Sequence, residues 1–198
     1  MIRSWHGQAG RLSMQEVVRV GVTVTFLRMD AAPREAAPSF PDGVEVQLVQ
    51  DCTVEFYRYL YNTVGNPHVW WLRRTMPDHQ LAGLLRDPRI TIHALYADGQ
   101  PAGFYELDST AWPTVNLGYF GLMPQAVGRG FGYAFLRHAV DTAWRAGPRV
   151  LTVNTCTADH PRALPTYKRA GFRVAREVRE EWNVPTSLGL PIPESLLL

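Results

Sequence analysis

Cysteine is scarce in this sequence, which contains only Cys52 and Cys156 among its 198 residues. One pair of cysteines in a chain of this length is no disulfide framework, so we expect two free thiols in a reducing cytosol. The sequence also lacks an apolar run long enough to span a bilayer, and polar residues interrupt the N-terminal stretch where a signal peptide would have its apolar centre. These absences predict a cytoplasmic location and no membrane partner.

An excess of charge of one sign is also missing. The formal net charge is +2 and no block of basic residues occurs, so nothing favours a nucleic-acid partner. Lysine is nearly absent, since Lys168 is the only one and the other basic residues are arginines. We interpret this bias as a property of codon usage and give it no functional weight. We expect no metal site.

The composition is that of one folded domain. Hydrophobic residues make up 46% of the chain, which is enough for one well-buried core. We expect an N-terminal extension over residues 1–20, a folded domain over residues 21–184, and a proline-containing C-terminal tail over residues 185–198. No internal repeat is visible.

The stretch Asn116–Tyr133 organises the rest of the chain. It begins as a strand, stops at Pro124, which has no N–H to donate to a ladder, and continues into Gly128, Gly130 and Gly132. An apolar stripe at helical spacing follows. Glycines let the backbone approach a phosphate closely, and the free N–H groups and dipole at a helix N-terminus favour an anion. We therefore expect this loop to bind a phosphate-bearing ligand, in particular a pyrophosphate.

Three kinds of phosphate-binding loop compete for this stretch. A P-loop requires Lys and then Ser or Thr after its last glycine, but Tyr133 and Ala134 stand there. A dinucleotide fold requires G-x-G-x-x-G and an acidic residue closing the next strand, but the spacing is G-x-G-x-G and Val150–Thr155 ends without a carboxylate. The third is the coenzyme A loop of the GCN5-related N-acetyltransferases (GNAT). Residues 124–132 resemble that family's signature, Q/R-x-x-G-x-G/A, although Val127 stands where Gln or Arg is usual.

A glycine-rich turn alone is weak evidence, because a tight strand-to-helix connection has the same composition. A second segment, Ala163–Phe172, resembles the A-x-x-x-Y-x-x-x-G-F segment of the same family and follows by one helix and one strand. Together the two segments cover Val115–Phe172 in the right order. The resemblance implies acetyl-coenzyme A as co-substrate and these cofactor-binding residues: Phe120, Gly121, Leu122, Val127, Gly128, Arg129, Gly130, Phe131, Gly132, Tyr133 and His160.

The strand pattern and the resemblance imply one fold class. Strands before the loop carry hairpin signals, including Asp98–Gly99, whereas Leu117–Asn154 is typical of a parallel strand–helix–strand crossover. We expect an α/β (α+β mixed) fold: a single GNAT-like domain whose mostly antiparallel sheet has a central parallel pair at the cofactor site and is flanked by helices. Gly21–Met29 or Val44–Val49 is its first strand. We favour Val44–Val49 because a helix with Asp51 as its N-cap follows directly.

Two residues are candidates for proton transfer. Tyr167 matches the tyrosine of the family segment, and a phenol with a pKa near 10 is protonated at neutral pH, so it can protonate a departing thiolate. A tyrosine that only packs in the core is the alternative. For the general base we choose Glu106, because the strand Thr114–Leu122, where the family often has a carboxylate, has Asn116 at about that place. An ion-paired role for Glu106 without catalysis is equally open.

Four further polar residues have less specific roles. Asp159 and His160 follow the parallel strand, and His160 falls where the family often has an Asn that contacts the cofactor. His160 could instead cap the helix that begins near Pro161. We interpret Asp108 as a turn residue, and Cys156 as a small buried hydrophobe because the family transfers its acetyl group directly.

Aromatic residues are dense where the family has one wall of its acceptor pocket. Tyr57, Tyr61, Trp70 and Trp71 are the candidate acceptor-binding residues, although at least half of them fit a core role equally well. The implied reaction is transfer of an acetyl group from acetyl-coenzyme A to an amine of a small molecule or peptide. The alternative is a coenzyme A-binding regulatory or interaction module that lacks an efficient base. A homodimer is compatible with both.

Overall fold

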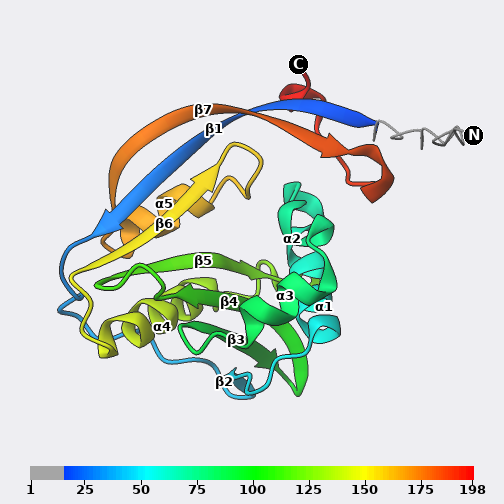
Figure 1. Cartoon of the computed structure of the whole chain (residues 1–198). Coiled ribbons are helices and arrows are strands. Elements are labelled where there is room, and N and C mark those ends of the chain that lie inside the picture. Colours follow the sequence, from blue (N-terminus) through cyan, green and yellow to red (C-terminus); the bar gives the residue numbers. More distant parts are fainter. Residues whose placement is uncertain (1–15) are drawn as a thin grey trace, which may run out of the picture.

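The computed structural model describes residues 16–198. Its central element is a seven-stranded sheet (Figure 1). Its strand order is β2-β3-β4-β5-β6-β1-β7. In chain order the strands are β1 (Val17–Met29), β2 (Val44–Leu48), β3 (Ile90–Ala97), β4 (Gln100–Asp108), β5 (Thr114–Leu122), β6 (Val150–Cys156) and β7 (Arg173–Pro185).

Helices connect and cover these strands. Within residues 16–198 the α-helices are α1 (Val54–Gly65), α2 (Leu72–Thr75), α3 (Asp78–Leu85), α4 (Gly132–Arg145) and α5 (Ala163–Arg169). None of these described helices is long and apolar enough to cross a membrane. The Thr53 hydroxyl accepts a hydrogen bond from the backbone N–H of Phe56 at 3.2 Å, so Thr53 caps α1. The prediction of Asp51 as the cap was wrong, because Asp51 lies before the helix with a φ of 48°.

The first half of the sheet is antiparallel. β2, β3, β4 and β5 pair in succession, and Asp98 and Gly99 between β3 and β4 have φ values of 54° and 74°, as a two-residue hairpin turn requires. β5 then pairs with β6 in parallel, from Thr114 opposite Val150 to Leu117 opposite Val153. The expected mixed fold, with a mostly antiparallel sheet and a parallel pair, is confirmed.

The two faces of the sheet carry separate apolar clusters. Phe104 and Tyr105 are neighbours on β4 and are both fully buried, because successive side chains of a strand point to opposite faces. Phe104 belongs to the cluster that includes Tyr57 of α1, whereas Tyr105 belongs to the cluster that includes Phe135 of α4. Both faces of the central strands are therefore covered by helices.

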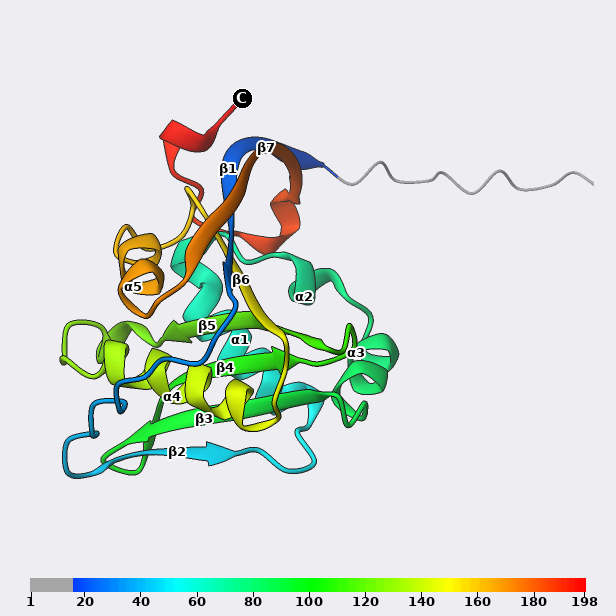
Figure 2. The ribbon, with the colours of Figure 1, turned by 90° about the vertical axis from the view of Figure 1, so that its left-hand side faces the viewer.

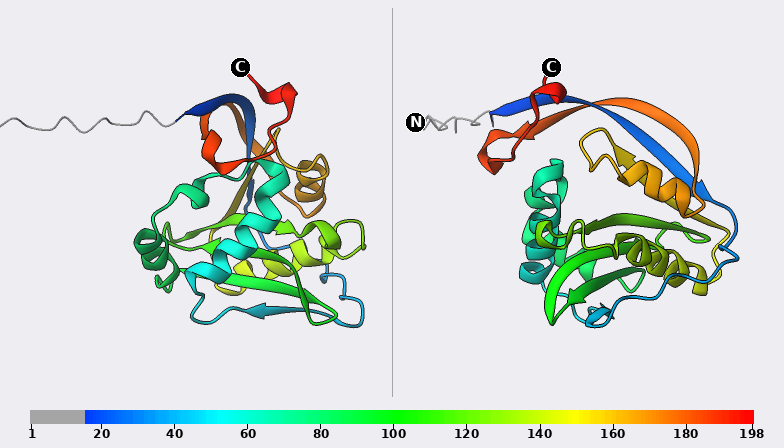
Figure 3. Two further views of the ribbon diagram at one scale, coloured as in Figure 1. Left: turned by 90° about the vertical axis from the view of Figure 1, so that its right-hand side faces the viewer. Right: turned by 180° about the vertical axis from the view of Figure 1, so that it is seen from behind.

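β1 and β7 form a long antiparallel ribbon that arches over the rest of the molecule (Figures 1 and 3). β1 begins at Val17, so residues 17–20, which were assigned to the N-terminal extension, lie in the sheet; residues 1–15 lie outside the described residues. The expected tail packs beside β1 (Figure 2): Leu198 donates its backbone N–H to the carbonyl of Arg19 at 3.2 Å, and Leu196 is buried. Both ends of the described chain thus extend the ribbon.

Candidate active site

A cavity of about 880 Å³ lies where β5 and β6 separate. One part of its wall comes from the glycine loop, the start of α4, and α5. Another comes from residues 68–73, which lead from the end of the α1 segment into the first residues of α2. The β1–β7 ribbon contributes Val24, Phe26, Glu180 and Trp182. The cavity therefore brings together segments from most of the chain.

The separation of β5 from β6 leaves part of β5 open. Their pairing ends at Leu117 and Val153, and β6 pairs onward with β1 through Asn154, Thr155 and Cys156. β5 continues to Leu122, and residues 118–122 all line the cavity. On this side no described strand pairs with residues 118–122, so their backbone groups can bind an extended ligand as an added strand would. Phe120, Gly121 and Leu122 lie where the cofactor was expected.

The glycine loop has the backbone that the sequence suggested. Gly128 and Gly130 have φ values of 85° and 93°, which side-chain-bearing residues rarely adopt, and a Cβ added at either would meet no atom within 4 Å. Gly132 begins α4, and Val127, Gly128, Gly130, Gly132 and Tyr133 all line the cavity. An open loop that leads into a helix N-terminus fits the pyrophosphate of coenzyme A.

Two residues predicted to bind the cofactor point elsewhere. Arg129 forms an ion pair with Asp98 of the β3–β4 turn at 3.0 Å, and its side chain does not line the cavity. Phe131 is buried in the core on the α4 side of the sheet. Arginines that the sequence analysis missed line this region instead: Arg162, and Arg169, whose guanidinium lies 3.9 Å from the centre of the Tyr133 ring. Their only sequence signal is their position beside the matched segment Ala163–Phe172.

Tyr167 lies on α5 with its ring packed against Phe120 and Phe172. It lines the cavity although it is almost fully buried, and its hydroxyl has no hydrogen-bond partner among the described residues. Burial, together with the negative charge of Asp159, raises the pKa of the Tyr167 phenol well above its ordinary value. The hydroxyl is therefore protonated and available to a bound molecule.

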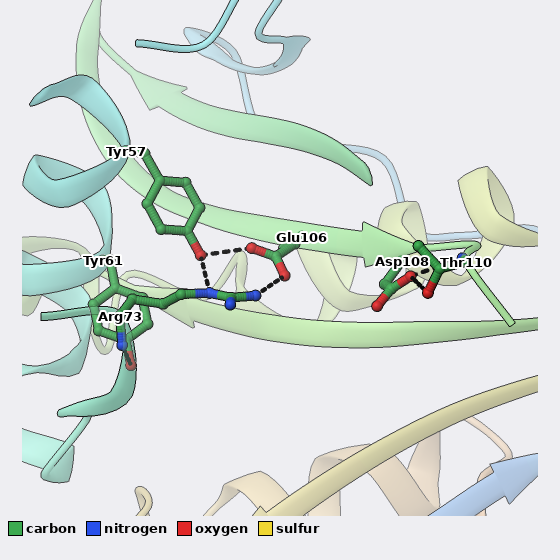
Figure 4. Close-up of polar contacts among 6 residues, drawn as sticks. All are labelled: Tyr57, Tyr61, Arg73, Glu106, Asp108 and Thr110. Atoms are coloured by element: carbon green, nitrogen blue, oxygen red, sulfur yellow. Dashed lines mark hydrogen bonds and ion pairs between the residues drawn. The ribbon is translucent and has the colours of Figure 1, made fainter. Parts of the chain in front are cut away.

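Glu106 lies on β4, lines the cavity and is 1% exposed. Figure 4 shows its contacts with Tyr57 and Arg73. The Tyr57 hydroxyl donates to its Oε2 at 2.5 Å, and Arg73 donates to its Oε1 at 3.0 Å. A Cβ at Gly118 of β5 would lie 3.1 Å from Oε1. Gly118, another residue that sequence reasoning missed, therefore keeps the space in front of this carboxylate oxygen open.

Arg73 of the short helix α2 contacts Glu106 and the tyrosines around it. Besides its ion pair with Glu106, its guanidinium lies 5.4 Å from the centre of the Tyr119 ring, and its backbone N–H donates to the Tyr61 hydroxyl at 3.3 Å. Burial raises the pKa of both Tyr61 and Tyr119. Nothing in the local sequence distinguishes Arg73 from the adjacent Arg74, so only the fold identifies it.

The four aromatic residues predicted to bind the acceptor divide into two groups. Tyr61, Trp70 and Trp71 line the cavity, whereas Tyr57 is fully buried behind Glu106. Trp70 also links two walls of the cavity, because its indole N–H donates a hydrogen bond to Asp159 Oδ1 at 3.2 Å. Three of the four thus border the cavity, whereas Tyr57 contacts the Glu106 carboxylate.

The alternative proton acceptors are engaged in local structure. Asp159 Oδ2 accepts hydrogen bonds from the Thr155 hydroxyl and the Cys156 N–H, and His160 Nδ1 accepts one from the Arg162 N–H. His160 lines the cavity but is tied to the turn before α5.

The remaining candidates also have structural roles. Asp108 Oδ1 accepts from Thr110 as a turn residue would, and Asn116 accepts from the Thr152 hydroxyl at 3.0 Å. Burial, with Asp159 nearby, raises the pKa of the Cys156 thiol to about 12, so this cysteine stays a thiol as its interpretation as a small hydrophobe requires.

Comparison with known proteins bears on the family. The model of the Acetyltransferase (GNAT) family matches residues 51–172. No curated protein matches this sequence at a significant level. A GCN5-related N-acetyltransferase from Sphaerobacter thermophilus is similar in structure, with a TM-score of 0.60 and 19% identity over 86% of this chain and 53% of that one. Another GCN5-related N-acetyltransferase, from Kribbella flavida, has a TM-score of 0.57 and 16% identity over 83% of this chain and 60% of that one.

A smaller protein is similar as well: an aminoglycoside acetyltransferase from an uncultured soil metagenomic sample has a TM-score of 0.54 and 12% identity, over 66% of this chain and 88% of that one. This chain spans only 53% and 60% of the two longer structures. At such identities the structures establish the fold, while the family model covers more than half of the chain. The chain belongs to the GNAT acetyltransferase family.

Proposed function

We propose that this protein transfers the acetyl group of acetyl-coenzyme A directly to an amine of a small molecule or peptide. The amine nitrogen bonds to the thioester carbonyl carbon while the carbon–sulfur bond breaks; the amine loses a proton and the departing thiolate gains one. One observation carries the proposal: the open glycine loop, the unpaired part of β5, Tyr167 and Glu106 all face one cavity.

The cofactor half of the cavity suits coenzyme A. The backbone N–H groups of residues 128–133 would hold the pyrophosphate, with Arg162 and Arg169 adding positive charge nearby. The backbone of residues 118–122 would bind the pantetheine arm. When bound, acetyl-coenzyme A supplies the activated acetyl group.

Two side chains would handle the protons. Tyr167 would protonate the sulfur, since its raised pKa keeps the phenol protonated at neutral pH. Glu106 would accept the amine proton through Oε1, directly or through one water, across the space that Gly118 leaves. Arg73 and Tyr57 hold the Glu106 carboxylate in one orientation.

The acceptor would enter between the ribbon and residues 68–73. Tyr61, Trp70, Trp71 and Tyr119 provide aromatic surfaces for its apolar part. Glu180 and Trp182 of β7 complete the wall. A cytoplasmic location, and partners limited to small molecules or peptides, go with this proposal.

One observation favours the second candidate, a coenzyme A-binding module without efficient catalysis. Glu106 is 1% exposed and already engaged by Arg73 and Tyr57. The two functions separate when the protein is incubated with acetyl-coenzyme A and a panel of amines while free thiol is measured. Amine-dependent thiol release supports the transferase. Calorimetric binding of coenzyme A without release above the uncatalysed rate for any amine supports the module.

A further inference from the structure

The strand β7 forms one edge of the sheet. It is 13 residues long and pairs with β1 along its length, while no described strand pairs with its other edge (Figure 3). Edge strands usually avoid association by being short, or by carrying proline or charged side chains, lysine above all. β7 carries charged side chains of both signs, so whether they oppose a partner strand depends on which charges that strand places opposite them. β7 has no proline before Pro185 and no lysine, and its pairing with β1 shifts register only beside Phe26 and Leu27. A long edge is thus left open to another strand.

We propose that this edge pairs with the β7 of a second copy of the chain, antiparallel, with Val178 of each copy facing Val178 of the other across a two-fold axis. Side chains directly opposite each other then follow from the sequence of the strand. Arg176 faces Glu180, and Glu177 faces Arg179. Val174 faces Trp182. Every charged residue between Arg176 and Glu180 therefore meets the opposite charge.

Neighbouring registers lack this complementarity. A shift of the pairing by one residue places Arg176 opposite Arg179 in one direction, and Glu177 opposite Glu180 in the other. A shift by two residues places Glu177 opposite its own copy, or Arg179 opposite its own copy. Like charges directly opposite each other destabilise a strand pair. The charge pattern thus selects one register, as a self-complementary interface with two-fold symmetry requires.

The four charged side chains of β7 from Arg176 to Glu180 have few partners within the chain: Glu177 accepts a hydrogen bond from the Thr25 hydroxyl at 3.1 Å, and the Arg176 guanidinium lies 4.4 Å from the centre of the Phe26 ring. Neither Arg176 nor Arg179 forms an ion pair within the described chain. Glu180 accepts a hydrogen bond only from Trp182 of its own strand, at 2.9 Å. Val174 and Val178 are 42% and 36% exposed. Pairing would cover these valines and bring each arginine beside a carboxylate.

The dimer would also extend the active-site cavity. Glu180 and Trp182 line the cavity, and in this register they face Arg176 and Val174 of the second copy. The second copy would therefore border the acceptor end of the site. This inference concerns association alone, so it can fail while the proposed activity holds.

Charge reversal tests the interface at Arg179 and Glu177, whose side chains lie on the face of β7 that does not line the cavity. Arg179→Glu places a glutamate opposite Glu177 in both symmetry-related pairs, and we expect dimerisation to weaken by roughly 30-fold. The double variant Glu177→Arg with Arg179→Glu restores opposite charges and should restore the dimer. Arg34→Glu, in the loop before β2, makes the same change of charge elsewhere and should leave association unchanged. Sedimentation equilibrium measures each; a wild-type monomer at every concentration, or a dimer indifferent to Arg179→Glu, overturns the proposal.

A cysteine on the axis tests the register itself, even if a charge variant folds poorly. Opposite Cα atoms of an antiparallel pair lie about 4.5–5.5 Å apart, within the range of a disulfide. Val178→Cys should therefore form a covalent dimer under mild oxidation. Val174→Cys, which lies on the same face but opposite Trp182, should not. A Val178→Cys protein that stays monomeric under oxidation, or linkage through position 174 instead, overturns this register; peptide mass spectrometry identifies the bond.

Discussion

The Tyr167 hydroxyl is the only polar atom of a side chain that otherwise packs against Phe120 and Phe172. Tyr167→Phe retains both ring contacts, so the fold and the affinity for acetyl-coenzyme A should change little. If Tyr167 protonates the departing sulfur, as proposed, the variant loses that proton donor. General acid catalysis contributes about 10²–10⁴-fold, and a thiolate is already a good leaving group, so we expect turnover to fall by about 10²-fold.

Turnover and the dissociation constant of acetyl-coenzyme A together decide the role of Tyr167. Tyr133→Phe is the matched control, because Tyr133 lines the same cavity and its hydroxyl makes only a long hydrogen bond to the Arg169 carbonyl, at 3.4 Å. Intact turnover in Tyr167→Phe would show that this tyrosine only packs. Loss of affinity together with turnover would show that its hydroxyl holds the cofactor.

Glu106→Gln keeps the size of the side chain and removes its charge. If Glu106 accepts the amine proton, turnover near neutral pH should fall by about 10²–10⁴-fold. The deficit should shrink as the pH rises toward the pKa of the acceptor amine, because more amine then arrives neutral. A pH–rate profile of both proteins measures this. A deficit that is the same at every pH would contradict the role of base.

Tyr57→Phe is the companion variant for Glu106. It removes one hydrogen bond to Oε2 but leaves the carboxylate and its ion pair with Arg73. We expect a smaller loss of turnover and a pH profile of wild-type shape. Thermal melting of both variants checks the fold, since loss of a buried ion pair destabilises a protein by about 3–5 kcal/mol.

Residue by residue, the sequence predicted best where a local motif carried the signal. Tyr167 and the loop glycines line the cavity as their motifs implied. Arg129 does not, because the nearby β3–β4 turn offers Asp98 as a partner. Arg73 and Gly118 could not have been found, because their roles depend on a meeting of α2, β4 and β5 that no spacing along the chain encodes.

At the scale of elements, the glycine loop invites a test of binding alone. Gly130→Glu would place a negative charge where the pyrophosphate is expected, and the affinity for coenzyme A should fall below detection in calorimetry. The φ of 93° at Gly130 adds backbone strain of about 1–2 kcal/mol. Gly147→Glu, after α4 at a φ of 74° with no atom near its Cβ, imposes similar strain away from the cavity. Unchanged affinity in Gly130→Glu would remove the phosphate assignment.

Local chemistry also explains which elements were predictable. The Asp98–Gly99 hairpin and the strand–helix–strand unit around α4 carry signals within a few residues, and both are present. The placement of β1 between β6 and β7 carries no such signal, because it depends on pairing between segments that are more than a hundred residues apart. Val44–Leu48 leads into α1 as expected, but the preference for it as the first strand was wrong. β1, which contains Gly21–Met29, comes earlier in the same sheet, and Val44–Leu48 is the edge strand beside β3.

At the scale of the molecule, the cavity is lined partly by residues inside the family match and partly by the β1–β7 ribbon outside it. The matched residues 51–172 include the glycine loop, Glu106 and Tyr167, whereas β1 and β7 lie outside them. Val24 and Phe26 of β1 and Glu180 and Trp182 of β7 nevertheless line the cavity. The ribbon is therefore the part of this chain that we expect to adapt the shared site to its own acceptor.

Stability in acid should depend on His93, which is 8% exposed on the α4 face of β3. Its ring stacks on Tyr105 with centroids 4.6 Å apart. The His138 ring is a neighbour of both, with its centroid 6.5 Å from that of His93 and its Nδ1 3.0 Å from the Tyr105 hydroxyl. Burial, helped by the charges of His138 and Arg145, lowers the pKa of His93 from 6.5 to about 4. The folded protein therefore holds this imidazole neutral in weak acid.

The sign of the effect follows from proton uptake. Above pH 6.5 neither state protonates His93, so its burial costs nothing there. Between pH 6.5 and about 4 the unfolded chain binds a proton that the folded chain excludes, so the free energy of unfolding decreases as the pH falls. From pH 7 to pH 5 the loss from this residue should be about 2 kcal/mol, at about 1.4 kcal/mol for each pH unit below 6.5.

Urea unfolding of His93→Phe at pH 7 and pH 5 measures this contribution. Phenylalanine keeps a ring of similar size against Tyr105 but cannot take up a proton, so the variant should lose about 2 kcal/mol less than the wild type between the two pH values. His79→Phe, on the exposed surface of α3, controls for the loss of a histidine as such. If the wild type and His93→Phe lose the same free energy of unfolding between pH 7 and pH 5, then His93 takes up a proton in the folded protein as readily as in the unfolded chain. Burial against Tyr105 and His138 would then not lower its pKa.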